Sequence, residues 1–235
     1  METKTKGLTP RLRAVAELVR HGAFVADVGT DHAYLPIALV SEGRAVGAVA
    51  SDINEGPYLR AKKNVEEQHL ENKITTVHCA GLSGIDKYSP TDILICGMGG
   101  ELIASIIDDA PFTKDPSIRL VLQPMTHPEI LREYLLKNGF EILFERIVKE
   151  EKLYQIICAE YSGKNKNIDY NDAELLLGRL NINAGGEQLV ELVCHHLNIL
   201  ERISTAKHSA LTDATFEDGL IERLKEIKND CSRAL

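Results

Sequence analysis

Two carboxylates and one glycine lie at the end of the first predicted strand, where an open parallel sheet binds its ligands. Residues 27–32 read Asp-Val-Gly-Thr-Asp-His and contain no G-x-G-x-x-G motif, so a dinucleotide site is not indicated. Ligands of such sheets bind beyond the carboxyl ends of the strands, and a glycine there lets the backbone approach them closely. Asp27 and Asp31 would repel a pyrophosphate but suit a cation. S-adenosylmethionine fits, because it carries a sulfonium and an α-ammonium group.

A further carboxylate ends the second predicted strand. Asp52 follows Asp27 by 25 residues, a spacing at which an acidic side chain can accept hydrogen bonds from both ribose hydroxyls. An alternative is that Asp27 and Asp31 only cap the helix that follows them. Together, the acidic loop and Asp52 favour the binding of a nucleoside or S-adenosylmethionine.

The ends of the third and fourth predicted strands complete this site. A loop at Gly81 and Leu82 could close on an adenine ring, and the glycines of residues 97–100 leave room for a bulky group. The Asn/Asp-Pro-Pro-aromatic motif of many methyltransferases is missing from that fourth strand end, and Met98 could pack there or touch the cofactor. The predicted cofactor-binding residues are Asp27, Gly29, Thr30, Asp31, Asp52, Ile53, Asn54, Gly81, Leu82, Gly97, Met98 and Gly99.

The candidate catalytic residues are Asp31, His32 and Tyr34, which lie in or just beyond the acidic loop. A histidine can act as a general base near neutral pH. His32 could equally be a hydrogen-bonded structural residue. His127, one strand end away, is a minor candidate.

Strands that alternate with helices must hold these loops at one edge of a sheet. Apolar runs predict strands at 23–28, 45–50, 74–77, 92–96 and 118–122, with helices between them. A first helix is expected from Pro10, capped by Thr9, to a stop at Gly22. The runs 140–148 and 153–161 are separated by four residues, too few for a helical crossover, and therefore predict an antiparallel hairpin. A parallel sheet that ends this way is typical of Rossmann-like methyltransferases, so the fold class is α/β.

The pattern changes after residue 161. Residues 162–167 form a polar linker, and the remainder shows only helical spacing of apolar residues, with a turn expected near 209–213. We therefore predict a Rossmann-like domain at 1–161 and an antiparallel helical hairpin domain at 162–235.

Composition limits the function classes. The chain has 235 residues, 44% of them hydrophobic, and a net charge of −8, which disfavours generic nucleic-acid binding; residues 1–20 are the local exception, at +3. No stretch reaches the roughly 18–20 apolar residues of a membrane span, and residues 1–6 lack the apolar core of a signal peptide. The five cysteines include no C-x-x-C pair, so neither a zinc ribbon nor a disulfide framework is indicated. We expect a cytoplasmic protein without membrane or metal partners, of undetermined oligomeric state.

Four short motifs stand out in the chain: Asp-Val-Gly-Thr-Asp-His-Ala-Tyr-Leu-Pro at 27–36, Glu-Gly-Pro-Tyr at 55–58, Gly-Met-Gly-Gly at 97–100 and Leu-Gln-Pro at 122–124. Together they resemble one known family, the bacterial tRNA (adenine-22 N1) methyltransferases, or TrmK family. The resemblance covers roughly residues 8–161 and extends to a helical C-terminal tail. It departs at Asp52, where the family often has Glu, and at Met125, where Asn often follows Gln-Pro.

The resemblance implies an S-adenosylmethionine-dependent methyltransferase with a coiled-coil-like C-terminal domain, acting on N1 of an adenine in the D-loop region of some tRNAs. Asp31 could then offset the positive charge that forms on the adenine, and residues 162–235, at a net −3, would help to hold the tRNA. A small-molecule methyltransferase and a non-catalytic nucleotide- or tRNA-binding module are the alternatives.

Overall fold

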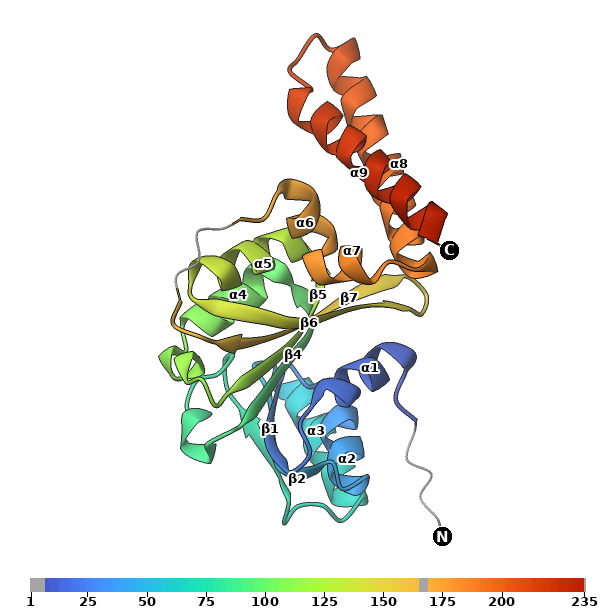
Figure 1. Cartoon of the computed structure of the whole chain (residues 1–235). Coiled ribbons are helices and arrows are strands. Elements are labelled where there is room, and N and C mark those ends of the chain that lie inside the picture. The colour runs from blue at the N-terminus through green and yellow to red at the C-terminus, as the bar shows by residue number, and fades with distance from the viewer. Residues whose placement is uncertain (1–6, 165–168, 235) are drawn as a thin grey trace.

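A single mixed sheet forms the centre of the computed structural model, which describes residues 7–164 and 169–234. Its strands are β1 (Ala23–Val28), β2 (Ala45–Asp52), β3 (Ile74–His78), β4 (Asp92–Gly99), β5 (Arg119–Thr126), β6 (Phe140–Lys149) and β7 (Leu153–Tyr161). They lie in the order β3-β2-β1-β4-β5-β7-β6, and β7 runs opposite to the other six strands. The predicted α/β methyltransferase sheet with its terminal hairpin is therefore confirmed (Figure 1).

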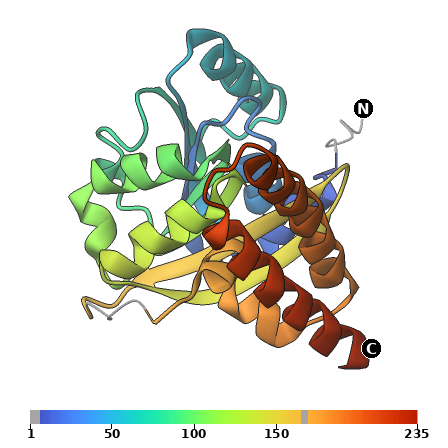
Figure 2. The ribbon, with the colours of Figure 1, turned by 90° about the horizontal axis from the view of Figure 1, so that it is seen from above.

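Helices cover both faces of this sheet. They are α1 (Pro10–Leu18), α2 (Tyr34–Ser41), α3 (Glu55–Glu67), α4 (Gly100–Asp108) and α5 (Pro128–Lys137). Helices α1, α2 and α3 share one apolar cluster with residues such as Leu94, while α4 and α5 share another with Ile93 and Ile95. This alternation is the period-2 pattern of a strand buried on both faces. Figure 2 shows the two helical layers on either side of the sheet.

Two local features differ from expectation. Helix α1 ends at Leu18 rather than at Gly22, because Val19 is already extended and the Arg20 amide donates to the buried Asp92 carboxylate at 2.9 Å. The helix after the acidic loop, α2, begins at Tyr34 with no side-chain cap. The alternative that Asp27 and Asp31 cap it is therefore wrong.

The C-terminal helices form an appendage of four segments. These are α6 (Asp172–Leu177), α7 (Arg179–Ala184), α8 (Glu187–Ser209) and α9 (Thr215–Ala234). Helices α8 and α9 run side by side and project away from the sheet (Figure 1), as expected for a hairpin that turns near 209–213. Residues 1–6 of the basic N-terminal segment and residues 165–167 of the predicted linker lie outside the described residues.

A buried ion pair attaches the appendage to the sheet. Arg132 of α5 donates from Nε to Glu145 of β6 at 2.6 Å and from Nη2 to Gln155 of β7 at 2.6 Å. Its Nη1 donates to the carbonyls of Leu175 and Leu176 at 2.7 and 3.2 Å. Both charged side chains are fully buried. Helix α6 is thereby tied to α5 and the sheet.

Candidate functional site

A pocket of about 260 Å³ opens at the carboxyl ends of the central strands. It lies between the loop after β1, the end of β4 and the N-terminal helix α1. Its lining residues are Arg11, Leu12, Asp27, Gly29, Thr30, Asp31, His32, Ala33, Tyr34, Leu35, Cys96 and Gly97. Seven of the predicted site residues therefore meet here: Asp27, Gly29, Thr30, Asp31, His32, Tyr34 and Gly97.

The loop after β1 disfavours a side chain at Gly29, because its backbone is left-handed there and the end of the Met98 side chain would have to move. Gly29 has φ +75°, and a Cβ there would lie 2.1 Å from the Cε atom of Met98. The backbone N–H groups of Gly29 and Thr30 both donate to the Ser51 carbonyl, at 2.8 and 2.9 Å. These contacts hold the loop against the end of β2, and Met98 packs on it instead of lining the pocket.

Asp27 is the buried acid of the pocket. Burial raises its pKa to about 6, a hydrogen bond with Thr30 opposes the rise, and the nearby charge of Asp52 adds to it. A carboxylate desolvated in this way gains most from a cation placed against it, because the cation restores the charge interactions lost on burial. The ammonium or sulfonium group expected here is such a partner.

Asp52 ends β2 beside this pocket without lining it. The Asn54 backbone and side-chain amides both donate to Oδ1 of Asp52, at 2.8 and 3.3 Å. Among the described residues no hydrogen bond reaches its other oxygen, which suits a ribose hydroxyl. The next side chain, Ile53, is 63% exposed although it is apolar. An aromatic base placed over it would cover that surface.

The candidate catalytic residues form a connected group at the pocket. Arg60 of α3 forms an ion pair with Asp31 and donates to it from Nε at 2.9 Å. His32 and Tyr34 stack with ring centroids 4.9 Å apart, and Asn64 donates to the His32 carbonyl at 2.9 Å. Asp31 is thus already paired with a guanidinium. It could offset positive charge on a substrate only if its carboxylate contacted Arg60 and the substrate at once, or if it released Arg60.

The remaining predicted residues contribute less directly. Leu82 is buried in the core, so only its backbone could meet a ligand, and Gly81 packs against Ile106 of α4. Gly97, with φ +80°, has open space where a Cβ would be. Gly99 instead faces Thr126 of β5. None of Asp52, Ile53, Asn54, Gly81, Leu82, Met98 and Gly99 lines the pocket itself.

Sequence reasoning missed Arg11 and Gln123. Arg11 is not among the predicted site residues, yet it lines the pocket and donates from Nη1 to Gln123 Oε1 at 2.5 Å. Gln123 is completely buried and also accepts from the Gly97 amide at 3.2 Å. For Gln123 the signal was present in the Gln-Pro pair near the end of β5. Nothing in the local pattern of α1 shows which of its arginines points inward.

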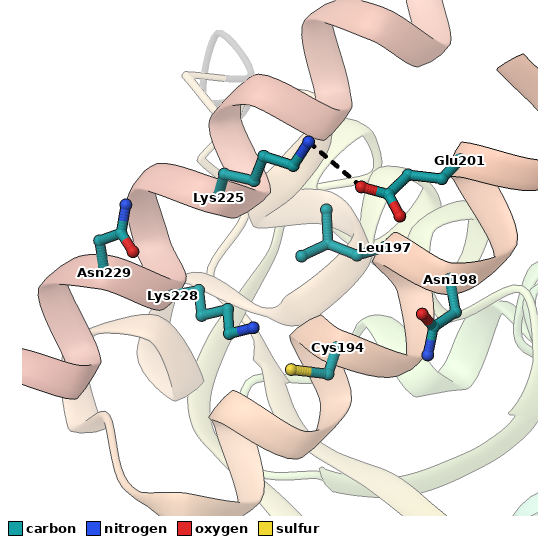
Figure 3. Close-up of a pocket in the computed structure, with 7 residues that line it drawn as sticks. All are labelled: Cys194, Leu197, Asn198, Glu201, Lys225, Lys228 and Asn229. Atoms are coloured by element: carbon teal, nitrogen blue, oxygen red, sulfur yellow. Dashed lines mark ion pairs between the residues drawn. The ribbon is translucent and has the colours of Figure 1, made fainter.

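Larger hollows lie elsewhere and lack such chemistry. A groove of about 350 Å³ runs between α8 and α9, lined by Cys194, Leu197, Asn198, Glu201, Lys225, Lys228 and Asn229. The Glu201–Lys225 ion pair, 3.1 Å long, joins the two helices beside it (Figure 3).

Within 7–164 and 169–234, no group of three or more His, Cys, Asp or Glu residues could hold a metal ion. None of the helices described is both long and apolar enough to cross a membrane.

Comparison with known proteins agrees with this geometry. Residues 8–157 match the family model described as "Methyltransferase domain". A Bacillus subtilis protein named tRNA (adenine(22)-N(1))-methyltransferase is 39% identical over 163 residues, which are 69% of this chain and 68% of that protein. The chain belongs to the TrmK family.

Solved structures of TrmK-family proteins match almost the whole chain. The crystal structure of the B. subtilis m1A22 tRNA methyltransferase TrmK has a TM-score of 0.81 at 31% identity and covers 97% of this chain and 98% of its own. A Streptococcus pneumoniae protein solved in complex with S-adenosyl-L-methionine has a TM-score of 0.84 at 32% identity, covering 94% and 100%. The likeness therefore includes the C-terminal helices of the family as well as its methyltransferase domain.

Proposed function

We propose that this chain is an S-adenosylmethionine-dependent methyltransferase that methylates N1 of adenine 22, in the D-loop region of tRNA. The observation that carries the proposal is the 39% identity to the B. subtilis enzyme of that name. A strand-end pocket whose acids suit a cationic nucleoside supports it. Similarity to a protein solved with S-adenosyl-L-methionine supports the cofactor.

The residues of the strand ends fit this cofactor. Asp27, buried with a raised pKa, would take a cationic group, and Asp52 would accept from the ribose. Ile53 offers its exposed apolar side chain to the adenine, while Gly29 and Gly97 let the backbone approach. When bound, the cofactor supplies an electrophilic methyl group. We propose the remaining predicted contacts, Thr30, Asp31, Asn54, Gly81, Leu82, Met98 and Gly99, as the surrounding wall, Leu82 through its backbone only.

The protein's share of catalysis is positioning rather than proton removal. N1 of adenine has a lone pair and carries no proton, so its attack requires no strong base. Holding the base in line should then contribute most. We propose that the stacked rings of His32 and Tyr34 orient the adenine, and that Asp31 offsets the positive charge formed on it. The adenine must leave its stack to reach this pocket.

Methyl transfer to tRNA tests the proposal directly. The purified protein is incubated with labelled S-adenosylmethionine and unmodified tRNA transcripts, and the product is mapped by mass spectrometry of nuclease fragments. We expect one N1-methyladenosine at position 22 and no label in a matched transcript with guanine there. Label in small molecules but not in tRNA would favour the alternative methyltransferase. Cofactor binding without any transfer would favour a non-catalytic module.

We further propose that the appendage helps to hold the tRNA. The sequence boundary predicted at 161/162 is a poor place to cut, because α6 supplies two of the carbonyls that bind Arg132. A cut after Gly185 keeps those contacts and removes only α8 and α9. We expect this truncated protein to bind the cofactor normally but to lose tRNA methylation. Unchanged methylation would show that the hairpin only packs on the sheet or dimerises.

We also propose a cytoplasmic location for the protein, because tRNA is modified there.

A further inference from the structure

An exposed arginine of α3 pairs with Asp31 at the rim of the strand-end pocket. Arg60 donates from Nε to Oδ1 of Asp31 at 2.9 Å, and its Nη2 forms an ion pair with the same oxygen. About half of each side chain stays exposed, 49% for Arg60 and 57% for Asp31. Asp31 lines the pocket, whereas Arg60 does not. The guanidinium therefore lies outside the pocket, against the carboxylate at its rim.

The loop after β1 is held in place by bonds other than this ion pair. Asn64, one turn after Arg60 on α3, donates from its side-chain amide to the His32 carbonyl at 2.9 Å. The Ala33 backbone amide donates to the Thr30 hydroxyl at 3.1 Å. Since an ion pair between half-exposed side chains contributes little to stability, it can open without unfolding the loop.

The Arg60 guanidinium has N–H groups that the protein does not use. Its hydrogen bonds within the described part of the chain all go to Asp31, through Nε and Nη2. Its Nη1 lies over the first turn of α3, 3.5 Å from where a Cβ on Gly56 would be. Lys62 and Lys63 follow on the same helix, and both are exposed. A planar guanidinium with unused donors in such a basic stretch fits the oxygens of a phosphate group.

We propose that Arg60 binds a backbone phosphate beside the target adenine, and that this contact draws it away from Asp31. The inference rests on the proposed function and adds to it the group that couples tRNA binding to the release of Asp31. A base that enters the pocket leaves its sugar and phosphates at the rim, where Arg60 lies.

Charge pairing favours an exchange of partners over a shared contact. If Arg60 kept both anions, the Asp31 carboxylate and the phosphate would lie close together and repel each other. The exchange gives Arg60 to the phosphate and leaves Asp31 beside the adenine, which becomes positively charged as N1 accepts the methyl group. Oδ2 of Asp31 lies 3.5 Å from Nε2 of His32, another lining residue, so the carboxylate already borders the pocket. Each anion then has a cationic partner.

Binding of the full-length protein to an unmodified tRNA transcript at several salt concentrations, without cofactor, tests the phosphate contact. Arg60→Gln should weaken tRNA binding about threefold to tenfold. The slope of log Kd against log salt should decrease by about 0.7–0.9, which corresponds to one lost phosphate contact. Arg60→Lys keeps the charge and should restore the slope, but only part of the affinity, because it lacks the guanidinium fork. S-adenosylhomocysteine, the product form of the cofactor, should bind Arg60→Gln as it binds the wild-type protein.

A matched control lies at the opposite edge of the sheet. Lys137 is an exposed cation that pairs with Glu133 at 2.6 Å, at the end of α5 that is remote from the carboxyl ends of the strands. Lys137→Gln should leave the tRNA affinity and its salt slope unchanged. An unchanged tRNA affinity in Arg60→Gln, or a loss of affinity with an unchanged salt slope, would overturn the phosphate contact.

A double variant tests the exchange itself. Asp31→Asn releases Arg60 in advance, so tRNA binding should tighten about twofold to fivefold while methyl transfer slows. In the Arg60→Gln background the same substitution should leave the tRNA affinity unchanged. Equal tightening in both backgrounds would reflect only the loss of a negative charge and would overturn the exchange. Wild-type protein that gives the expected binding results but transfers no methyl group to tRNA would overturn the proposed function alone.

Discussion

Two arginines are drawn into the interior of this protein, and their surroundings differ. Arg132 is completely buried and bonds Glu145, Gln155 and two carbonyls of α6 through all three of its nitrogens. Among the described residues, the Arg11 side chain donates a hydrogen bond only to Gln123. Its guanidinium also lies over the Tyr154 ring, 5.3 Å from the centroid, and its Nε has no hydrogen-bond partner. A saturated guanidinium can only hold structure together. A partly bonded one at a pocket retains binding capacity for a ligand.

The same contrast separates the acids of the two regions. Glu145 sits against Arg132 and also accepts from the Leu180 amide at 2.9 Å. Within the part of the chain that the structure describes, no cation forms an ion pair with Asp27, and burial raises its pKa to about 6. The buried charges between α5, β6 and α6 are thus paired with each other, whereas the strand-end pocket can still accept a charged ligand. Stability and binding capacity are concentrated in different places.

The largest expected effect is the loss of stability on breaking the buried Arg132–Glu145 ion pair. Arg132→Met leaves the Glu145 carboxylate buried without its cation, which we expect to cost about 3–5 kcal/mol of unfolding free energy. Chemical denaturation measures this loss. Arg13→Gln, which removes an exposed pair with Glu42, is the control and should cost less than about 1 kcal/mol.

A double variant sharpens that result. Replacing both Arg132 and Glu145 by methionine removes the two charges together, so the loss should be clearly smaller than the sum of the single losses. Additive losses of unfolding free energy would mean that the two side chains do not act as a pair. The claim that Arg132 and Glu145 neutralise each other would then be wrong.

At the strand-end pocket, Asp27→Asn should raise the free energy of unfolding instead of lowering it. The pKa of this carboxyl rises from 3.8 to about 6 on folding, so the folded state is penalised when the group is charged. The penalty is absent below about pH 4, grows as pH rises to about 6, and is complete above it. At pH 8 we expect the variant to be more stable by on the order of 3 kcal/mol, while cofactor binding is lost.

Denaturation at two pH values checks this directly. The gain in stability should be present at pH 8 and nearly absent at pH 4. A variant that is destabilised at pH 8 would show that Asp27 has structural partners that outweigh its desolvation.

How much of this was predictable follows from the range of the interactions. The strands, the terminal hairpin and the acidic loop follow from local patterns, and the TrmK motifs indicated the family. The inward position of Arg11 was not predictable, because it depends on Gln123, 112 residues away. The pairing of Asp31 with Arg60 was missed for the same reason, since it joins the loop after β1 to α3. Leu82 lies in the loop after β3, as predicted, but tertiary packing buries its side chain.

Asp52→Ala should produce a smaller effect, a partial loss of cofactor affinity. Removing this carboxylate deprives two ribose hydroxyls of a charged acceptor, so we expect cofactor binding to weaken by about 1–3 kcal/mol. Isothermal titration with S-adenosylhomocysteine measures the change, and circular dichroism confirms that the variant is folded. Asp115→Ala, on the surface between α4 and β5, serves as the acidic control. Unchanged affinity in folded Asp52→Ala would place the ribose site elsewhere.

The smallest expected effect is a pH dependence of cofactor affinity. If the Asp27 carboxylate must be charged to hold the ammonium group, binding weakens as pH falls through about 6. Between pH 8 and pH 5 the affinity for S-adenosylhomocysteine should drop about tenfold, because a group of that pKa is then about nine-tenths protonated. His32 lies in the same pocket, so His32→Gln is measured alongside. The drop should persist in His32→Gln. A pH profile that becomes flat in that variant would show that the dependence requires the histidine side chain, and would remove Asp27 from the ammonium site.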